Sequence, residues 1–293
     1  MLEYGLSVLA REMGKGMRHK TEPKGWFEWV VQAVVHAGIV LTMGVLLYLI
    51  VHVLWNGIPY VTADLFAFRY NTLNMSLFPS LVTTVYLVLG TLALAVPLGI
   101  GTALYMTEYA RRSSAGVKLV RIANETLAAI PSIVYGLFGF LFFVTFCRLG
   151  YSLASGILTM TILVLPLVVK TTEEALLTVP QNLREGSYGL GVGKKDTILK
   201  IILPVAMRGV IAGIILAIGR IVGETVALMY TIGTVAEVPD HLLSSGRTMA
   251  VHMYALSGEG LHTDKAYATG VVLILTVLIM NEASAYIVRK WRK

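Results

Sequence analysis

The chain has 293 residues, of which 56% are hydrophobic and only 14% are charged, and its mean hydropathy is +0.73. A soluble core could not bury this much apolar surface, so the composition predicts an all-α, polytopic membrane protein. The net charge of +7 does not indicate nucleic-acid binding, because the basic residues form no continuous stripe. A single cysteine, Cys147, excludes a disulfide framework and a cysteine-based metal cluster. We interpret it as a packing residue.

Six apolar segments are long enough to cross a membrane. The predicted spans lie at about 30–54, 79–106, 123–147, 153–169, 205–235 and 267–288. They are preceded by a basic arm at 1–29, interrupted by a polar loop at 170–204 and followed by a basic tail at 289–293. The first apolar run is too long for the core of a signal peptide, so we interpret it as an uncleaved anchor. No soluble domain is predicted beside this transmembrane unit.

Basic residues are distributed unevenly between the two predicted sides of the membrane. Nineteen of the 24 Lys and Arg residues fall in the N-terminal arm, the segments 107–122 and 170–208, and the tail, whereas four fall on the opposite side. By the positive-inside rule, both termini and the 170–204 loop are expected in the cytoplasm. The expected location is the plasma (inner) membrane of a bacterium or archaeon.

The polar loop contains the stretch EGSYGLGVGKKDTILKIILP, from Glu185 to Pro204. Apolar residues spaced by three, four and seven after Gly191 predict a short amphipathic helix, and the glycines permit a positive-φ turn before it. Two short helices joined by a bend would form a compact knob that could fill a groove on a soluble partner. A nucleotide-binding loop is excluded, because Tyr188 replaces its first glycine and Lys195 replaces its Ser or Thr.

The spacing of this stretch matches the motif E-A-A-x-x-x-G-x(9)-I-x-L-P of ABC importer permeases. Small residues, Gly186 and Ser187, stand where alanines are usual. The alternative is an ordinary solvated loop. The residues predicted to form the coupling element are Glu185, Gly186, Ser187, Gly191, Ile201, Leu203 and Pro204.

One arginine falls inside a predicted span. Arg220 follows Val205 by fifteen residues, about 22 Å along a helix, which places it near the bilayer midplane. A charge at that depth costs about 2.5–3.5 kcal/mol even on the lower insertion scales, so it should face the bundle interior or water. Glu224 follows at i+4 on the same helical face, close enough to pair with it. Glycines at small-xxx-small spacing predict close packing of this helix: Gly209, Gly213, Gly219 and Gly223.

Two interpretations of Arg220 and Glu224 remain open. The two charges could neutralise each other and fix helix packing, or they could line a translocation path in which the guanidinium offers a fork of donors to an oxyanion. Phosphate keeps a P–OH that can donate to a carboxylate, whereas sulfate has none, so Glu224 could discriminate between them. Thr225 is a further candidate for the path. Ser132 is another, beside the helix-interrupting Pro131, although its hydroxyl could instead satisfy the freed backbone.

Three stretches together resemble the PstA-type permeases of phosphate ABC transporters. They are AAIPSIVYGLFG at 128–139, the loop at 171–204 and LAIGRIVGETVALMYT at 216–231, and the likeness extends over about 80–293. The resemblance implies the type I ABC importer permease fold with six transmembrane helices and a role in high-affinity uptake of inorganic phosphate. It implies a PstC-like permease, two PstB-like ATPases that bind ATP and Mg, and a PstS-like phosphate-binding protein as partners. It implies no cofactor and no catalysis in this chain.

Three alternatives differ in what the sequence should contain. Permeases for sulfate, molybdate or phosphonate share the loop motif, so the loop does not choose the cargo. An ion-coupled secondary transporter could use His36, Arg220 and Glu224 as a relay, but it would need no docking loop and often carries an inverted repeat, which we do not detect. An intramembrane enzyme would need paired His or Asp ligands within the spans, and the sequence has none there.

Overall fold

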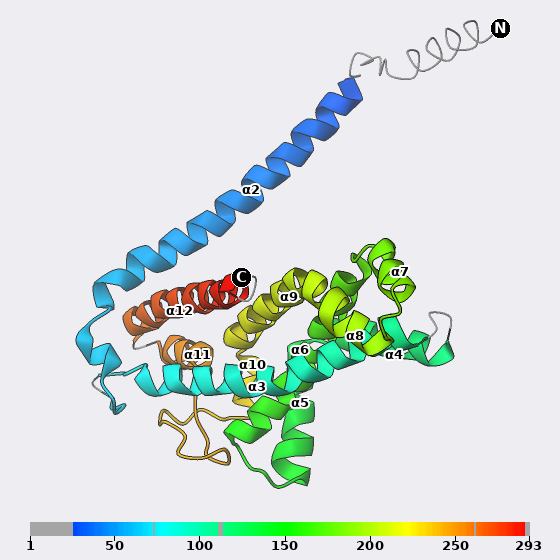
Figure 1. The fold of residues 1–293 in the computed structure, drawn as a ribbon. Coiled ribbons are helices and arrows are strands. Elements are labelled where there is room, and N and C mark those ends of the chain that lie inside the picture. Colours follow the sequence, from blue (N-terminus) through cyan, green and yellow to red (C-terminus); the bar gives the residue numbers. More distant parts are fainter. Residues whose placement is uncertain (1–25, 73, 111–113, 261, 291–293) are drawn as a thin grey trace, which may run out of the picture. The chain divides into compact units, whose positions relative to one another are not determined.

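The computed structural model describes residues 26–72, 74–110, 114–260 and 262–290, and every regular element in these ranges is a helix (Figure 1). The chain divides after His52 into two compact units. The first contains most of α2 (Trp26–Gly57), a long and uniformly apolar helix. The second unit, Val53–Lys293, contains all the other elements. Most of the predicted arm at 1–29 and the last three residues of the tail lie outside the described residues.

The second unit is built from four long helices and several short ones. The long helices are α3 (Phe78–Leu104), α6 (Leu153–Leu177), α9 (Leu203–Gly223) and α12 (Thr263–Lys290). The short ones are η1 (Ile58–Tyr60), η2 (Ala63–Phe66), α4 (Ala115–Ala129), α5 (Ser132–Gly139), α7 (Gln181–Gly189), α8 (Lys194–Thr197), α10 (Val226–Met229) and α11 (Met249–Glu259). Three π-helical segments continue them: η3 (Tyr105–Tyr109), η4 (Phe140–Phe146) and η5 (Ile198–Ile202).

Five helices in the described residues are long and apolar enough to cross a membrane. A sixth span results if α4 and the α5–η4 segment count as one, since these two pieces meet at 100° across a short break. The predicted all-α membrane class is therefore confirmed. At the end of η4, Cys147 is exposed, so its interpretation as a packing residue was wrong.

Two predicted spans differ from the helices that form. Helix α6 continues past residue 169 to Leu177, and α9 ends at Gly223, short of the predicted end at 235. The apolar run after α9 is only partly helical and lies partly in the protein interior: Leu228 in α10 and Ile232 beyond it are 0% exposed, whereas Val235 is 46% exposed. An apolar sequence predicts that a segment is removed from water, but it does not show whether lipid or the rest of the protein covers that segment. Helix α11 lies between the fifth and sixth predicted spans and was not foreseen.

Helix α6 is the centre of the second unit, because 67% of its most apolar stretch is buried, compared with 33% for α3 and for α9. Both of these helices pack along it (Figure 1). Two glycines on α9 permit the close approach to α6, because neither has a side chain. A Cβ on Gly209 would lie 2.5 Å from the Cβ of Ala175, and one on Gly213 would lie 2.7 Å from the Cβ of Thr171. The predicted close packing is thus confirmed at these two glycines. At Gly219 and Gly223 a Cβ would meet nothing within 4 Å, so there the prediction was wrong.

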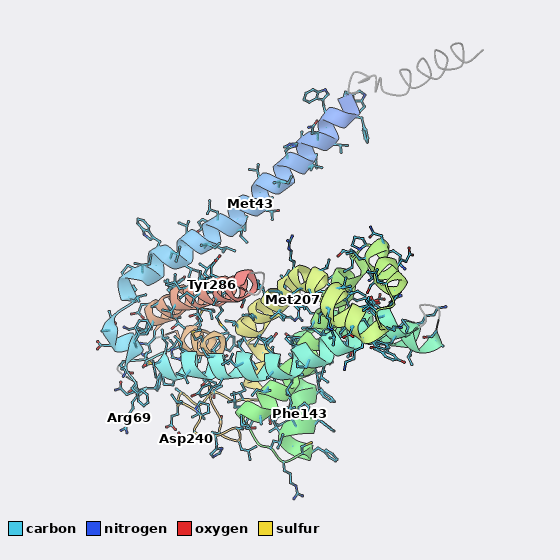
Figure 2. The ribbon with its side chains drawn as sticks, viewed as in Figure 1. Met43, Arg69, Phe143, Met207, Asp240 and Tyr286 are labelled. Carbon is cyan, nitrogen blue, oxygen red and sulfur yellow. The ribbon has the colours of Figure 1, made fainter. Side chains whose placement is uncertain are left out.

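The two ends of the second unit differ in content. Helices α7 and α8 lie near the end of α3 that leads into η3, and we call this the loop end (Figure 1). At the opposite end α11 joins the start of α3, where the backbone N–H of Met249 donates to Thr84 Oγ1 at 3.0 Å. Figure 2 shows Arg69 and Asp240 at that opposite end, away from Met207 on α9.

A buried polar cluster lies at the opposite end. The guanidinium carbon of Arg247, a residue only 6% exposed, lies 5.0 Å from the centre of the Tyr70 ring. The ring of His252 lies edge-on to the same tyrosine, with 6.1 Å between ring centres. Burial, together with the charge of Arg247, lowers the pKa of His252 to about 3, so this histidine is neutral beside the arginine.

The glycine contacts between α6 and α9 can be tested by stability. We expect Gly213→Ala to lower the free energy of unfolding by about 1–3 kcal/mol, because the new methyl group overpacks the contact with Thr171. Gly219→Ala is the matched control, and the higher helix propensity of alanine should leave it neutral or stabilised by up to about 1 kcal/mol. Thermal unfolding of the purified chain in detergent compares them. A greater loss in Gly219→Ala would contradict the packing.

Candidate functional site

The third span is interrupted at Pro131, as predicted. Proline has no N–H, so the carbonyl of Leu127, four residues earlier, loses its helical donor. That carbonyl accepts instead from the backbone N–H of Ile130 at 3.1 Å and from the hydroxyl of Tyr135 at 2.7 Å, and the second bond bridges the break from the α5 side. Among the described residues, the Ser132 hydroxyl makes no hydrogen bond, and its predicted role in satisfying the backbone therefore falls to Tyr135. The half-buried Ser132 begins α5 with an unused hydroxyl.

A second interruption follows α9. After Gly223, Glu224 takes an extended conformation, with ψ at 128°, and the short helix α10 begins two residues later. The carboxylate of Glu224 accepts a hydrogen bond from the backbone N–H of Ala227 at 3.3 Å. The prediction that Glu224 continues the helix on the face of Arg220 was wrong, because the helix has already ended. No ion pair joins the two residues in the part of the chain that the structure describes.

The two interruptions lie against each other. Helix α5 packs on α10 so closely that a Cβ on Gly136 would lie 2.8 Å from the Cα of Ala227. Tyr135, Ile221 and Ala227 belong to one buried apolar cluster. The charge of Arg220 is near enough to act electrostatically on Tyr135. The structure thus brings together the elements that carry the predicted candidates: Ser132 begins α5, and Thr225 is half-buried between α9 and α10.

Arg220 carries its charge without a neutralising carboxylate within the described chain. Its side chain is exposed on the single chain although it belongs to a span-forming helix. The N-terminal end of α5, which begins at Ser132 with no side-chain cap, adds its partial positive charge to this region. Interrupted helices that present an N-terminus inside the membrane favour anionic ligands. No group of three His, Cys, Asp or Glu residues in the described ranges could hold a metal ion.

The predicted knob is present at the loop end. Helix α7 and helix α8 are joined by a turn in which Gly191 has φ at +77°, a conformation that glycine adopts without strain. Most of the motif remains accessible: Glu185, Gly186, Gly191 and Pro204 are exposed, while Ile201 and Leu203 are half-buried. One boundary differs from the prediction, because the helix runs on from Lys194 through η5 into α9. The knob therefore connects directly to the helix that carries Arg220.

The unusual Ser187 of the motif is explained by its partner. Its side chain is buried, and its Oγ lies 2.8 Å from Oγ1 of Thr197, which is also buried. The pair joins α7 to α8 across the bend. Thr197 also donates to the carbonyl of Gly193 at 3.1 Å, so both hydroxyls are satisfied. A hydroxyl at position 187 is tolerated because the facing position supplies another hydroxyl.

Comparison with known proteins identifies this arrangement. Residues 95–293 match the family model described as "Binding-protein-dependent transport system inner membrane component". The chain belongs to this family. Its members are permease subunits of ABC importers, which are transport components rather than catalytic ones, so a multi-pass inner-membrane permease is what the six apolar segments represent.

Named relatives are similar over most of the chain. The "Probable ABC transporter permease protein YqgI" of Bacillus subtilis is 34% identical over 69% of this chain and 74% of that protein. The "Phosphate transport system permease protein PstA homolog" of Mycoplasma pneumoniae is 31% identical over 85% of this chain but only 39% of its own length. "Phosphate transport system permease protein PstA 1" of Mycobacterium tuberculosis is 35% identical over 66% of this chain and 64% of that protein.

Solved structures support the fold. A chain of a bacterial alginate ABC transporter, in complex with an alginate pentasaccharide-bound periplasmic protein, superposes with a TM-score of 0.67 at 16% identity, covering 91% of this chain and 96% of that one. An inward-facing MetNI methionine ABC transporter chain gives 0.58 at 18% identity, covering 73% and 93%. These likenesses concern the fold alone, and they confirm the predicted ABC importer permease architecture.

The Ser187–Thr197 pair generates a stability prediction. We expect Thr197→Val to destabilise the chain by about 1–3 kcal/mol, because the buried Ser187 hydroxyl then loses its partner. Adding Ser187→Ala should recover much of this loss, since no unpaired hydroxyl remains. Thermal unfolding of both variants gives the comparison. Equal unfolding midpoints for the single and double variants would show that the two hydroxyls are not coupled.

Proposed function

We propose that this chain forms the translocation path of an ATP-driven, high-affinity importer of inorganic phosphate and couples to an ATPase through its 185–204 loop. The observation that carries the proposal is the placement of Arg220, an unneutralised cation beside two apposed helix interruptions. The names of the relatives in Mycoplasma and Mycobacterium favour phosphate as the cargo. The family membership disfavours an ion-coupled secondary transporter.

The chemistry of the path follows from two side chains. The guanidinium of Arg220 offers two parallel N–H donors to an oxyanion, which suits a tetrahedral anion better than a lysine would. Glu224 is held in place by its bond to the N–H of Ala227 through Oε1, and Oε2 is left as an acceptor. A P–OH of phosphate can donate to that oxygen, and sulfate has no such proton. Thr225 and Ser132 would supply neutral hydroxyls to the same path.

The loop end would face the cytoplasm, as would both termini, in agreement with the distribution of basic residues. In this orientation two PstB-like ATPases would bind ATP and Mg and contact the accessible motif residues. A PstC-like permease would complete the transmembrane pair and would cover the exposed side of Arg220. A PstS-like phosphate-binding protein would dock at the opposite end. The chain itself would hold no cofactor.

The first test is uptake by the complex reconstituted in proteoliposomes with its binding protein. Arg220→Gln should lose at least about tenfold in phosphate uptake while assembling normally, because a charge-assisted contact to the anion is removed. Arg208→Gln is the matched control, since Arg208 is an exposed arginine on the same helix nearer the loop end. Full coupled uptake by Arg220→Gln would make this arginine structural. Transport of sulfate, molybdate or phosphonate in preference to phosphate would overturn the cargo.

The second test concerns selectivity. Glu224→Gln keeps an oxygen that can accept from Ala227 but removes the carboxylate charge. We expect phosphate uptake to fall by about tenfold and competition by sulfate to increase, since the like-charge barrier against a proton-free dianion is gone. Uptake of labelled phosphate with and without excess sulfate measures both effects. Unchanged phosphate transport together with unchanged sulfate rejection would remove Glu224 from the path.

A further inference from the structure

A buried ion pair fixes the first helix of the knob to the rest of the second unit. Arg184 lies on α7, and Glu108 lies on η3, which continues α3. The two side chains are only 12% and 6% exposed. Nη2 of Arg184 lies 3.0 Å from Oε1 of Glu108, and Nε donates to the same oxygen at 3.3 Å. Two donors of the guanidinium therefore hold one carboxylate oxygen.

The same guanidinium also binds the end of α6. Nη1 donates to the carbonyl of Val179 at 2.6 Å, and Nη2 donates to the carbonyl of Leu176 at 2.9 Å. The last carbonyls of a helix have no partner within the helix, and a cation there is favourable. Arg184 therefore caps α6 while it pairs with Glu108. One side chain joins three elements: α7, the end of α6 and the continuation of α3.

The connection spans the turn at which α6 ends and α7 begins. Between α6 and α7 the sequence turns at Pro180, which has no N–H to donate and starts α7 without a side-chain cap. A polar cleft of about 510 Å³ lies beside the turn, lined by residues from η3, α6, α7 and α8 that include Thr107, Gln181 and Lys194. Arg184 crosses this space with its bonds to Glu108 and to the two carbonyls, and Lys194 crosses it with a contact of 4.8 Å to the centre of the Tyr109 ring.

A second ion pair of the knob is exposed to solvent, unlike the buried pair of Arg184 and Glu108. Lys200 and Asp196 lie 3.1 Å apart at i,i+4, but their side chains are 73% and 53% exposed. Exposed pairs of this kind contribute little, because water and salt screen them. A buried pair is different: removing one partner leaves an uncompensated charge, and its geometry is fixed by the other bonds. Rigid transmission through the knob is expected from Arg184 and not from Lys200.

We propose that Arg184 is a positioning residue that makes α7 move together with the ends of α3 and α6. A displacement of α7 by a docked ATPase then reaches two spans through the guanidinium, in addition to reaching α9 through the continuous helix from Lys194. The inference rests on the proposed function in one respect, that an ATPase docks on the 185–204 loop. It does not depend on which anion is carried.

The test measures coupling rather than activity alone. The complex is reconstituted in proteoliposomes with its binding protein, and ATP hydrolysed and anion taken up are determined in the same vesicles. Arg184→Gln should lower the uptake per ATP by about tenfold with basal ATP hydrolysis retained, because charged hydrogen bonds to three groups are lost. Arg184→Lys should lower it by about threefold, since one ammonium cannot reproduce the fork that reaches both carbonyls and the carboxylate.

Two further variants separate a loss of coupling from a failure of the complex to assemble. Glu108→Gln combined with Arg184→Gln removes the unpaired buried carboxylate, so the complex should assemble while uptake per ATP remains low. Lys200→Gln is the matched control and should couple like the wild type. An assembled Arg184→Gln or double variant with wild-type uptake per ATP would overturn the inference. If the wild-type complex carries sulfate in place of phosphate, the cargo proposal fails, and the ratio measured with sulfate still decides the role of Arg184.

Discussion

A backbone inside a membrane must find its hydrogen bonds within the protein, and this chain interrupts two membrane-spanning segments. At the first break, the N–H of Ile130 and the Tyr135 hydroxyl both donate to the carbonyl of Leu127, which Pro131 deprives of its helical donor. At the second, the Glu224 carboxylate accepts from the N–H of Ala227. Backbone groups at both breaks are thus satisfied within the protein, next to the helix that carries Arg220.

A single helix connects the loop end to the second interruption. A continuous helix runs from Lys194 to Gly223, so the second half of the knob and Arg220 belong to one rod. That rod packs on α6 along its length: Gly209 and Gly213 make close contacts nearer the loop end, and Ile221 is buried in the apolar cluster nearer the second interruption. A helix packed along its length moves as one piece, so a displacement of the knob would be passed on to the turn that carries Arg220.

The features that depend on short stretches of sequence were predicted correctly. The all-α class, the interruption at Pro131 and the positive φ of Gly191 followed from composition, proline chemistry and glycine spacing. The end of α9 at Gly223 was not predicted, because an apolar run looks the same whether lipid or protein covers it. Since the predicted helix ran past this end, Glu224 was wrongly expected on the same helical face as Arg220. The contact of Arg184 with Glu108 spans 76 positions in the sequence, and no periodic pattern connects residues that far apart.

The π-helical segments have an evolutionary consequence. Such a turn holds one residue more than the α-helical turn it replaces. One of the three, η5, lies in the knob and runs directly into α9. Deleting one residue there would restore an ordinary α-turn and leave the following helix in register. A lineage could therefore change the length of the docking region by single residues without rotating the helix face that presents Arg220.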